Sequence, residues 1–284
     1  MKRNLISGDT ADFPSLTFRV GGHFCSICAR HVSGIMLMPD AVTPIPQSPA
    51  YCLGLVDVRG YVTPLIDLRT LFGLPSLNSQ YEAFCAMIDS YKTDHENWVG
   101  TLRDCITAQT PFSLSADCHG CRLGKWYDGY TPANQSVASQ LKKLEEPHER
   151  FHESAALYER YLADPGGAIT LADVKTFFER SSTLYKPEIL KILEDTKESF
   201  LREYQSILII LEQDGETVLS FIVDSVDAVE TITRVPQARD GDFWENNEFV
   251  VAIGRGERSA ANILMLDDAA LIALSQRITF QAER

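Results

Sequence analysis

The spacing of apolar residues changes twice along this chain, and these changes restrict its fold more than any other feature. Near both ends, apolar and polar residues alternate, as at Leu16, Phe18 and Val20, which is typical of β-strands with one buried face. Between residues 79 and 199 the apolar residues instead recur every three or four positions, which is typical of amphipathic helices. The sequence therefore predicts an α+β protein in which a helical segment interrupts a β-rich domain.

The two β-patterned ends share one order of elements. Hairpin turns are expected at Gly21-Gly22, Arg59-Gly60 and Asp214-Gly215, because glycine accepts the left-handed backbone that tight turns require. Asp67 and Asp267 each follow an apolar strand and precede a short helix. We therefore expect two similar small β units, one at each end of the chain.

Four amphipathic helices are predicted in the middle of the chain. Pro147 interrupts the second, so it either kinks this helix or begins a new one at its first turn. Pro187 separates the third helix from the fourth. Helices with apolar faces pack into a bundle. The four faces cover residues 81–106, 137–162, 171–178 and 190–200.

Three histidines lie in or beside these apolar faces. His95 and His148 occupy positions where the helical pattern requires an apolar residue, and His152 follows His148 by four residues. A single histidine in such a place is more often an ordinary buried side chain. Three of them in one bundle would each need a buried partner, so a shared divalent cation is the better explanation.

A thiol completes this predicted metal site. A closed tetrahedral site needs a fourth ligand, for which Cys121 is the candidate and Cys118, three residues earlier, is its rival. Mixed imidazole and thiolate ligands suit zinc. Four protein ligands leave no position for a reactive water, so we expect a structural or sensing site and no catalytic residue. The thiolate is the reactive group, because oxidation of the sulfur weakens its bond to zinc.

The charge and hydropathy of the chain limit its partners. Lys and Arg number 26 and Asp and Glu number 39, so the formal net charge is −13. Nucleic acids bind to basic surfaces, so we expect no nucleic-acid partner. No apolar run reaches the length of a membrane span and the N-terminus has no signal core, so we expect no membrane insertion and a cytoplasmic location. In the cytoplasm, cysteines are expected to be reduced or metal-bound.

The predicted metal segment carries a family resemblance over residues 79–199. It rests on the order of His95, the hexapeptide that begins at Cys121, and His148 followed by His152. This order resembles the chemoreceptor zinc-binding (CZB) domain, whose members hold zinc through a His/Cys/His/His set in a helical bundle. They are regulatory modules, often dimeric, that respond to zinc or to oxidants. The resemblance implies that the zinc ligands are His95, Cys121, His148 and His152.

The β-patterned segments carry a second resemblance. It rests on residues 18–22, 44–46, 53–60 and 62–68 before the helices and on residues 207–267 after them. These stretches resemble the CheW-like domain, which couples chemoreceptors to the histidine kinase CheA without catalysis. The resemblance implies two small five-stranded β-barrels, interrupted by the inserted bundle. It also implies that receptor and kinase contacts come from Arg59 and from the valines that alternate around it, Val56, Val58 and Val62.

These observations predict a flexible arm (1–14), a CheW-like first half (15–78), an inserted CZB-like four-helix bundle (79–199) and a CheW-like second half (200–284). We hypothesise a chemotaxis adaptor whose inserted module senses zinc or oxidants through a zinc thiolate. In that hypothesis Cys118 is a candidate redox partner of Cys121. The alternative is a constitutive scaffold in which zinc is purely structural and the helical insert forms a homodimer.

Overall fold

The protein divides into two compact units, residues 1–77 with 205–284 and residues 78–204, called here the β unit and the helical unit. The structure, a computed structural model, describes residues 14–39, 41–130, 135–203, 206–235, 247–258 and 261–282. All but the last residue of the predicted arm, 1–14, therefore lies outside the described residues. The helical unit extends beyond the predicted residue 199, because its last helix continues to Glu203.

One of the two sheets in the β unit has six strands. Its order is β8-β1-β2-β11-β10-β9, in which β2 and β11 are parallel and the other neighbours are antiparallel. The turn predicted at Gly21-Gly22 joins β1 to β2. The strands are β1 (Ser15–Val20), β2 (His23–Cys28), β8 (Ser225–Glu230), β9 (Ile232–Arg234), β10 (Val250–Gly256) and β11 (Ile263–Leu266).

The other sheet has five strands in the order β3-β6-β7-β5-β4, in which only the β5–β7 pair is parallel. The predicted turn at Arg59-Gly60 joins β4 to β5 with left-handed φ angles of 55° and 87°, and Asp214-Gly215 joins β6 to β7 in the same way. The strands are β3 (Val32–Leu37), β4 (Cys52–Val58), β5 (Tyr61–Asp67), β6 (Ile207–Gln213) and β7 (Glu216–Val223).

Each sheet takes strands from both ends of the chain, so the prediction of one β unit at each end was wrong. The hairpin β1–β2 pairs with β11, and the hairpin β6–β7 pairs with β5. The two β-patterned ends of the chain therefore share an order of elements, but strands from each end pair with strands from the other. The two parallel pairings decide this exchange, and they join segments too distant in sequence for a local pattern to encode them.

The sheets also differ from the predicted pair of five-stranded barrels. One sheet has a sixth strand because β9 pairs with the outer edge of β10, and neither strand order closes on itself within the described ranges. At the outer edge of β4, Thr43 and Leu55 form an isolated bridge. The observed fold is therefore a mixed α+β fold with two β-sheets and a helical region.

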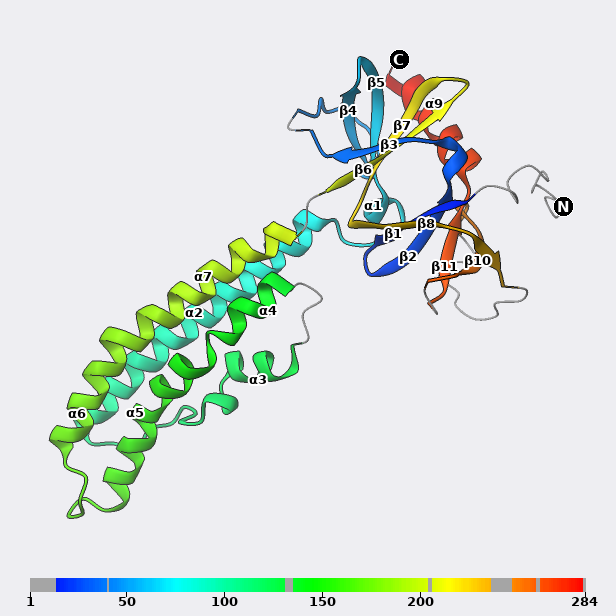
Figure 1. Cartoon of the computed structure of the whole chain (residues 1–284). Helices are drawn as coiled ribbons and strands as arrows, with labels where there is room; N and C mark the ends of the chain where they lie inside the picture. Colours follow the sequence, from blue (N-terminus) through cyan, green and yellow to red (C-terminus); the bar gives the residue numbers. More distant parts are fainter. Residues whose placement is uncertain are drawn as a thin grey trace. The chain divides into compact units, whose positions relative to one another are not determined.

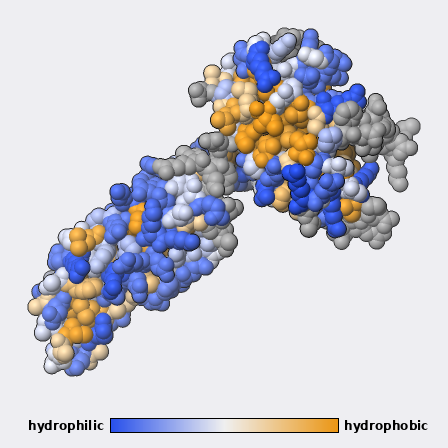
Figure 2. Space-filling view, viewed as in Figure 1, coloured by the Kyte–Doolittle hydropathy of each residue, from blue (hydrophilic) through white to orange (hydrophobic). Residues whose placement is uncertain are grey.

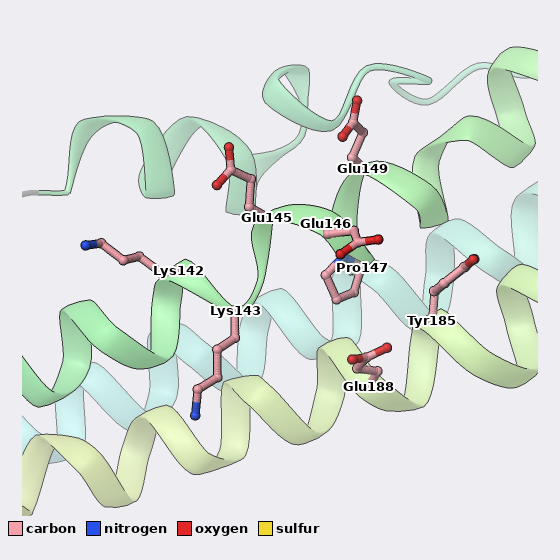
Figure 3. Close-up of a pocket in the computed structure, with 8 residues that line it drawn as sticks. All are labelled: Lys142, Lys143, Glu145, Glu146, Pro147, Glu149, Tyr185 and Glu188. Carbon is pink, nitrogen blue, oxygen red and sulfur yellow. The ribbon is translucent and has the colours of Figure 1, made fainter.

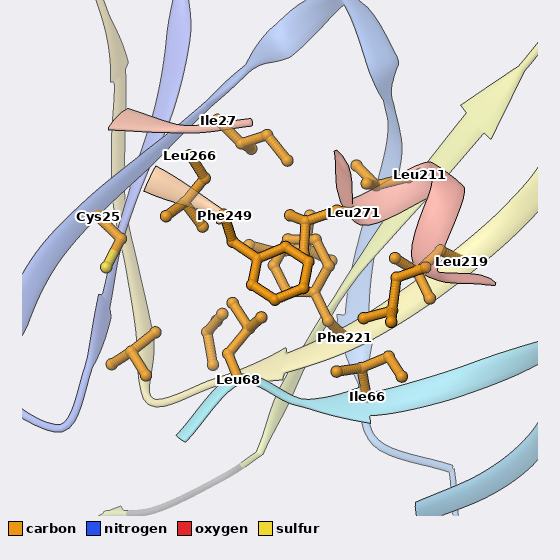
Figure 4. Packing of buried hydrophobic residues seen from close by; sticks show 14 of the residues in the cluster. Cys25, Ile27, Ile66, Leu68, Leu211, Leu219, Phe221, Phe249, Leu266 and Leu271 are labelled. Atoms are coloured by element: carbon orange, nitrogen blue, oxygen red, sulfur yellow. The ribbon is translucent and has the colours of Figure 1, made fainter. Parts of the chain in front are cut away.

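The main core of the β unit lies between elements from both ends of the chain, as Figure 4 shows. Phe221 on β7 and Leu271 on α9 (Asp268–Ala282) are fully buried there, and the Phe18 ring lies 5.8 Å from that of Phe221. Leu68 enters the same core from the short helix α1 (Leu68–Leu71). As predicted, Asp67 caps this helix, because its carboxylate accepts the N–H of Arg69 at 2.9 Å.

A second, smaller core lies on the opposite face of the five-stranded sheet. Successive β6 residues alternate between the two cores, because side chains along a strand point to opposite faces. Ile209 and Leu211 belong to the main core, whereas Leu208 and Ile210 belong to the smaller one. The five-stranded sheet is therefore covered by apolar side chains on both faces, which explains the unbroken apolar run of β6.

The helical unit is built around the long helix α2, which lies beside α7 in Figure 1. Two ion pairs join these helices, one between Lys92 and Glu194 at 2.8 Å and one between Lys197 and Asp89. None of the described helices has the length and hydropathy of a membrane span. The helices are α2 (Leu77–Ala108), α3 (Arg122–Gly129), α4 (Gln135–Lys142), α5 (Glu145–Ala163), α6 (Leu171–Arg180) and α7 (Lys186–Glu203).

The two prolines act differently in the helical unit. Pro147 lies in the first turn of α5 and so begins a new helix. Pro187 lies in the first turn of α7, but the π-helical turn Ser181–Tyr185 joins α6 directly to α7. A π turn changes the hydrogen-bond pattern where the missing N–H of proline would break it. The predicted third and fourth helices are therefore one continuous run, and α3 is a helix that the periodicity did not predict.

Candidate metal centre

Four side chains from three separate segments converge inside the helical unit. His95 comes from α2, Cys121 precedes α3, and His148 and His152 lie one turn apart on α5. One ligand atom from each of the four lies within 4.8 Å of all the others. The structure thus brings together the complete set that the sequence predicted, and leaves Cys118 outside it.

Two of the distances within this group are close to the edges of a tetrahedral zinc site. Nε2 of His95 lies 3.1 Å from Nε2 of His148, which lies 3.4 Å from Sγ of Cys121. Zinc bonds of about 2.0 Å to nitrogen and about 2.3 Å to sulfur give tetrahedral edges of roughly 3.3–3.6 Å. The three imidazoles are buried and the thiol is half-buried. The donor set, these two distances and the burial suit a closed zinc site.

Backbone contacts orient two of the ligands. Nδ1 of His95 donates to the Tyr91 carbonyl, one turn earlier on α2, at 2.8 Å, which leaves Nε2 free to bind a metal. Cys121 is the N-cap of α3, where its sulfur accepts the N–H of Gly124 at 3.2 Å. Only glycine fits at position 124, because a Cβ would lie 1.9 Å from the Cys118 carbonyl oxygen. The hexapeptide thus places the thiol through a helix cap and a close backbone contact.

The environment of His152 points to a bound ion. Both of its ring nitrogens are buried, and the described residues offer them no partner with hydrogen-bond geometry. Buried polar atoms without a partner destabilise the folded state unless an ion or a water molecule binds them. The Trp98 ring packs 4.8 Å from that of His152, and its indole N–H donates to the Ser115 carbonyl at 2.9 Å. Trp98 therefore holds the segment leading to Cys121 against the imidazole that a cation would bind.

Burial keeps all four ligand groups neutral when no ion is bound. Desolvation lowers the pKa of His95, and desolvation with charge repulsion from the neighbouring histidines lowers the pKa of His148 to about 2 and that of His152 to about 3. Burial also raises the pKa of the Cys121 thiol. A coordinated cation would instead lower the pKa of the Cys121 thiol, because a metal-bound thiol is deprotonated.

Acid is therefore expected to destabilise the zinc-free protein. In the unfolded chain these histidines have an ordinary pKa near 6.5 and take up protons that the folded protein excludes. The stability that these neutral histidines contribute is complete above the pKa of the unfolded chain. It decreases as the pH falls below that value, by up to about 1.4 kcal/mol per histidine per pH unit. Urea unfolding at several pH values, monitored by circular dichroism, measures this slope. His148→Gln should reduce the slope, and a wild-type stability that stays constant on acidification would contradict the expectation.

The candidate centre is reached through an open pocket of about 380 Å³. Three of the four ligand residues, His95, Cys121 and His152, line it, together with Trp98 and Arg122. Arg122 forms an ion pair with Asp94 at 2.8 Å, also on the pocket wall. Small solutes can therefore reach the thiol without unfolding of the helices.

A second pocket, of about 470 Å³, lies where α4 ends and α5 and α7 begin (Figure 3). Four of its eight lining residues are glutamates, but within the described part of the chain they do not converge as the His/Cys group does. It is therefore a mixed-charge surface hollow rather than a second metal site. Its lining residues are Lys142, Lys143, Glu145, Glu146, Pro147, Glu149, Tyr185 and Glu188.

The predicted contact residues of the β unit fall into two groups. Arg59 is exposed at the tip of the β4–β5 hairpin, with its guanidinium packed against Gly34 of β3, and Val62 is 66% exposed. Val56 and Val58 are each only 1% exposed and belong to the smaller core. They cannot offer a contact surface, because alternation along β4 points both side chains into this smaller core.

Sequence reasoning missed two exposed apolar side chains on β3. Ile35 and Leu37 are 45% and 58% exposed and lie on the strand that Arg59 touches. Their period-two spacing places both side chains on one face of a strand, but the packing of the β unit decides that this face is exposed. Figure 2 shows a large apolar area on the visible face of the β unit. Exposed apolar areas of this kind are typical of protein interfaces.

Two family models match the chain. The chemoreceptor zinc-binding domain matches residues 95–158, a range that contains all four ligand residues, and the CheW-like domain matches residues 14–112. The protein therefore contains a CheW-like domain and a chemoreceptor zinc-binding domain. The matches overlap at 95–112, a stretch that begins on α2.

Two known proteins are similar to this chain. The chemotaxis protein CheW of Rhizobium meliloti (strain 1021) is 36% identical over 62 residues, which are 21% of this chain and 37% of that protein. The match thus spans little more than a third of that relative's length. The crystal structure of the scaffolding protein TtCheW from Thermoanaerobacter tengcongensis aligns with 90% of this chain and 88% of its own, at 13% identity and a TM-score of 0.36.

Proposed function

We propose that this protein is a cytoplasmic chemotaxis adaptor that couples chemoreceptors to the kinase CheA and holds Zn²⁺ in its helical unit. The observation that carries the metal assignment is the convergence of His95, Cys121, His148 and His152 within 4.8 Å. The two family matches and the similarity to a CheW protein support the adaptor role. The adaptor itself carries out no catalysis.

A zinc ion held by these residues would tie α2 and α5 to the segment that precedes α3. The helical unit is joined to the β unit at both ends, after α1 on one side and before β6 on the other. β5, which leads into α1, and β6 belong to the same five-stranded sheet and flank β7. Repacking of the helices after loss of the thiolate ligand would therefore act on that sheet through two covalent connections, which is the basis for sensing zinc or oxidants.

The metal assignment is tested by elemental analysis of the purified full-length protein. Wild type is expected to contain about one zinc per chain. Cys121→Ala and His148→Ala should lose it, because each removes one of four ligands, whereas Cys118→Ala should retain it because Cys118 lies outside the group. Equal zinc in wild type and both ligand variants would exclude this site.

The partner assignment is tested at Arg59. Arg59→Glu reverses an exposed charge beside the apolar side chains of β3. If Arg59 faces a carboxylate of the partner in the proposed contact, two like charges then face one another at a cost of several kcal/mol, and receptor-dependent activation of CheA should fall by at least about tenfold. The matched control is Arg255→Glu, which reverses an exposed charge at the counterpart Arg-Gly step on β10. Equal activation by the two variants would contradict the assignment.

Sensing and constitutive scaffolding differ in one measurable respect. In the sensing proposal, a zinc chelator changes the receptor-coupled activity of CheA with wild type and leaves it unchanged with Cys121→Ser. Unchanged activity with both proteins would favour the constitutive scaffold. In that case light scattering with and without zinc tests whether the helical unit instead forms a homodimer.

A further inference from the structure

Cys118 and Cys121 are three residues apart, at the start of one 3-10 turn and directly after its end. Cys118 begins the 3-10 turn Cys118–Gly120, and Cys121 follows it as the N-cap of α3. The Asp117 carboxylate accepts the N–H of His119 at 3.0 Å, and the Gly120 N–H donates to the Asp117 carbonyl at 3.1 Å. A 3-10 helix rises about 2.0 Å per residue, so Cα atoms three residues apart along this turn lie roughly 6 Å apart. A disulfide spans Cα separations of about 4.4–6.8 Å, so it could join these two cysteines with little movement of the backbone.

Two close contacts hold this turn in place. A Cβ at Gly124 would lie 1.9 Å from the Cys118 carbonyl oxygen, so that carbonyl rests directly on the first turn of α3. A Cβ at Gly120 would lie 2.4 Å from the Ser115 hydroxyl oxygen. The backbone between the two cysteines is therefore packed on both sides, which limits its movement.

The two thiols differ in their relation to the candidate metal centre. The sulfur of Cys121 belongs to the convergent group, whereas that of Cys118 does not. Both residues are half-buried, and Cys121 lines the open pocket of about 380 Å³. A small oxidant can thus reach the ligand sulfur while a second thiol that binds no metal lies three residues away.

We propose that Cys118 is the resolving thiol for Cys121, and that a peroxide converts the pair into an intramolecular disulfide that releases zinc. This inference rests on the proposed zinc site. The Cys121 thiolate attacks one peroxide oxygen, the O–O bond breaks, and the leaving hydroxide is protonated to water, which leaves a sulfenic acid. The Cys118 sulfur then attacks the sulfenic sulfur, the S–O bond breaks, and the thiol proton of Cys118 leaves with the hydroxide as a second water. The two sulfurs together give two electrons to the peroxide.

The disulfide and the metal exclude one another. A disulfide sulfur has no thiolate charge, so oxidation leaves three imidazoles at the centre and weakens metal binding. A thiol reductant restores both thiols, because disulfides are reversible. Without a resolving thiol, further peroxide would carry Cys121 to a sulfinic acid, which ordinary reductants do not reverse. Cys118 therefore makes the loss of zinc reversible.

The test uses full-length wild type, Cys118→Ser and the control Cys105→Ser. Cys105 lies ten residues from His95 on α2, about 15 Å along the helix, so it is remote from the centre. Each protein is loaded with zinc, treated with hydrogen peroxide, and then reduced with dithiothreitol and given zinc again. Zinc is measured at each stage with a chromogenic chelator, and the oxidation state of each cysteine is read by mass spectrometry after alkylation.

Wild type and Cys105→Ser should release zinc, form the 118–121 disulfide and bind zinc again after reduction. Cys118→Ser should bind zinc at first, release it to peroxide, acquire two oxygens on Cys121 and fail to bind zinc after reduction. The proposal is overturned if oxidised wild type lacks this disulfide, or if Cys118→Ser recovers as fully as wild type. Cys118→Ala repeats the comparison should the serine variant not fold. If wild type forms the disulfide but binds no zinc at the outset, the zinc proposal fails and the thiol pairing stands.

Discussion

Removing zinc is expected to lower the free energy of unfolding of the helical unit by about 4 kcal/mol, if free zinc had been held about a thousandfold above its Kd. Only the folded protein brings the four ligand atoms within 4.8 Å, so zinc stabilises that state by mass action. Zinc fingers unfold without their metal, but this unit has a buried core of its own that includes Ile88, Leu102 and Phe151. The zinc-free unit should therefore remain helical and unfold at a lower urea concentration, which circular dichroism measures.

Two variants make this experiment specific. His148→Ala should abolish the difference between zinc-loaded and chelated protein, because it removes a central ligand. His119→Ala should preserve the difference, because His119 is exposed and pairs with Asp128 outside the group. An identical unfolding midpoint for wild type with and without chelator would contradict the prediction. Irreversible unfolding on chelation would instead favour a purely structural zinc.

Arg69→Leu is expected to destabilise the β unit by about 3–5 kcal/mol, because it leaves a buried carboxylate without its charged partner. Nε and Nη2 of Arg69 donate to the two oxygens of Asp224 at 2.6 and 2.8 Å, and the side chains are only 7% and 15% exposed. Asp224 also accepts the N–H of Gly21 at 2.7 Å. This cluster joins α1 and the β7–β8 connection to the β1–β2 turn, and so links the two sheets.

Urea unfolding of the full-length protein measures this loss. The matched control is Arg19→Leu, whose ion pair with Asp227 is 3.4 Å long and much more exposed, so its removal should cost less than about 1 kcal/mol. The double variant Arg69→Leu, Asp224→Leu should be more stable than Arg69→Leu alone, because no uncompensated charge remains. Similar losses for Arg69→Leu and Arg19→Leu would show that the buried pair does not hold the sheets together.

Most of the local elements could be predicted from the sequence. The strands and hairpins around Gly21, Arg59 and Asp214 follow from period-two alternation and from the left-handed backbone at the turns. The long helix α2 follows from its apolar face. These features depend on residues a few positions apart, so a short stretch of sequence contains the information that determines them. The prediction of separate helices at 171–178 and 190–200 was wrong for a local reason, because the π turn Ser181–Tyr185 continues the helix up to Pro187.

The arrangement of the strands could not be predicted in the same way. The pairing of β5 with β7 and of β2 with β11 joins residues more than 150 positions apart. Any of several pairings would satisfy the same alternating patterns, so only the packing of the complete β unit selects one. The burial of Val56 and Val58 follows from this packing, and so does the exposure of Ile35 and Leu37.

One part of the candidate metal centre could be predicted from the sequence, and the other part required the tertiary structure. From the sequence alone it follows that His148 and His152 share one face of a helix, since residues four apart in a helix always do. The thiol of Cys121 precedes His148 by 27 residues, so no local rule places it beside them. The tertiary structure decided that α2 and the N-cap of α3 bring His95 and Cys121 to that face, and that Cys118 stays outside the group. Helical spacing is a property of the local backbone, whereas the convergence of separate segments depends on how the whole helical unit packs.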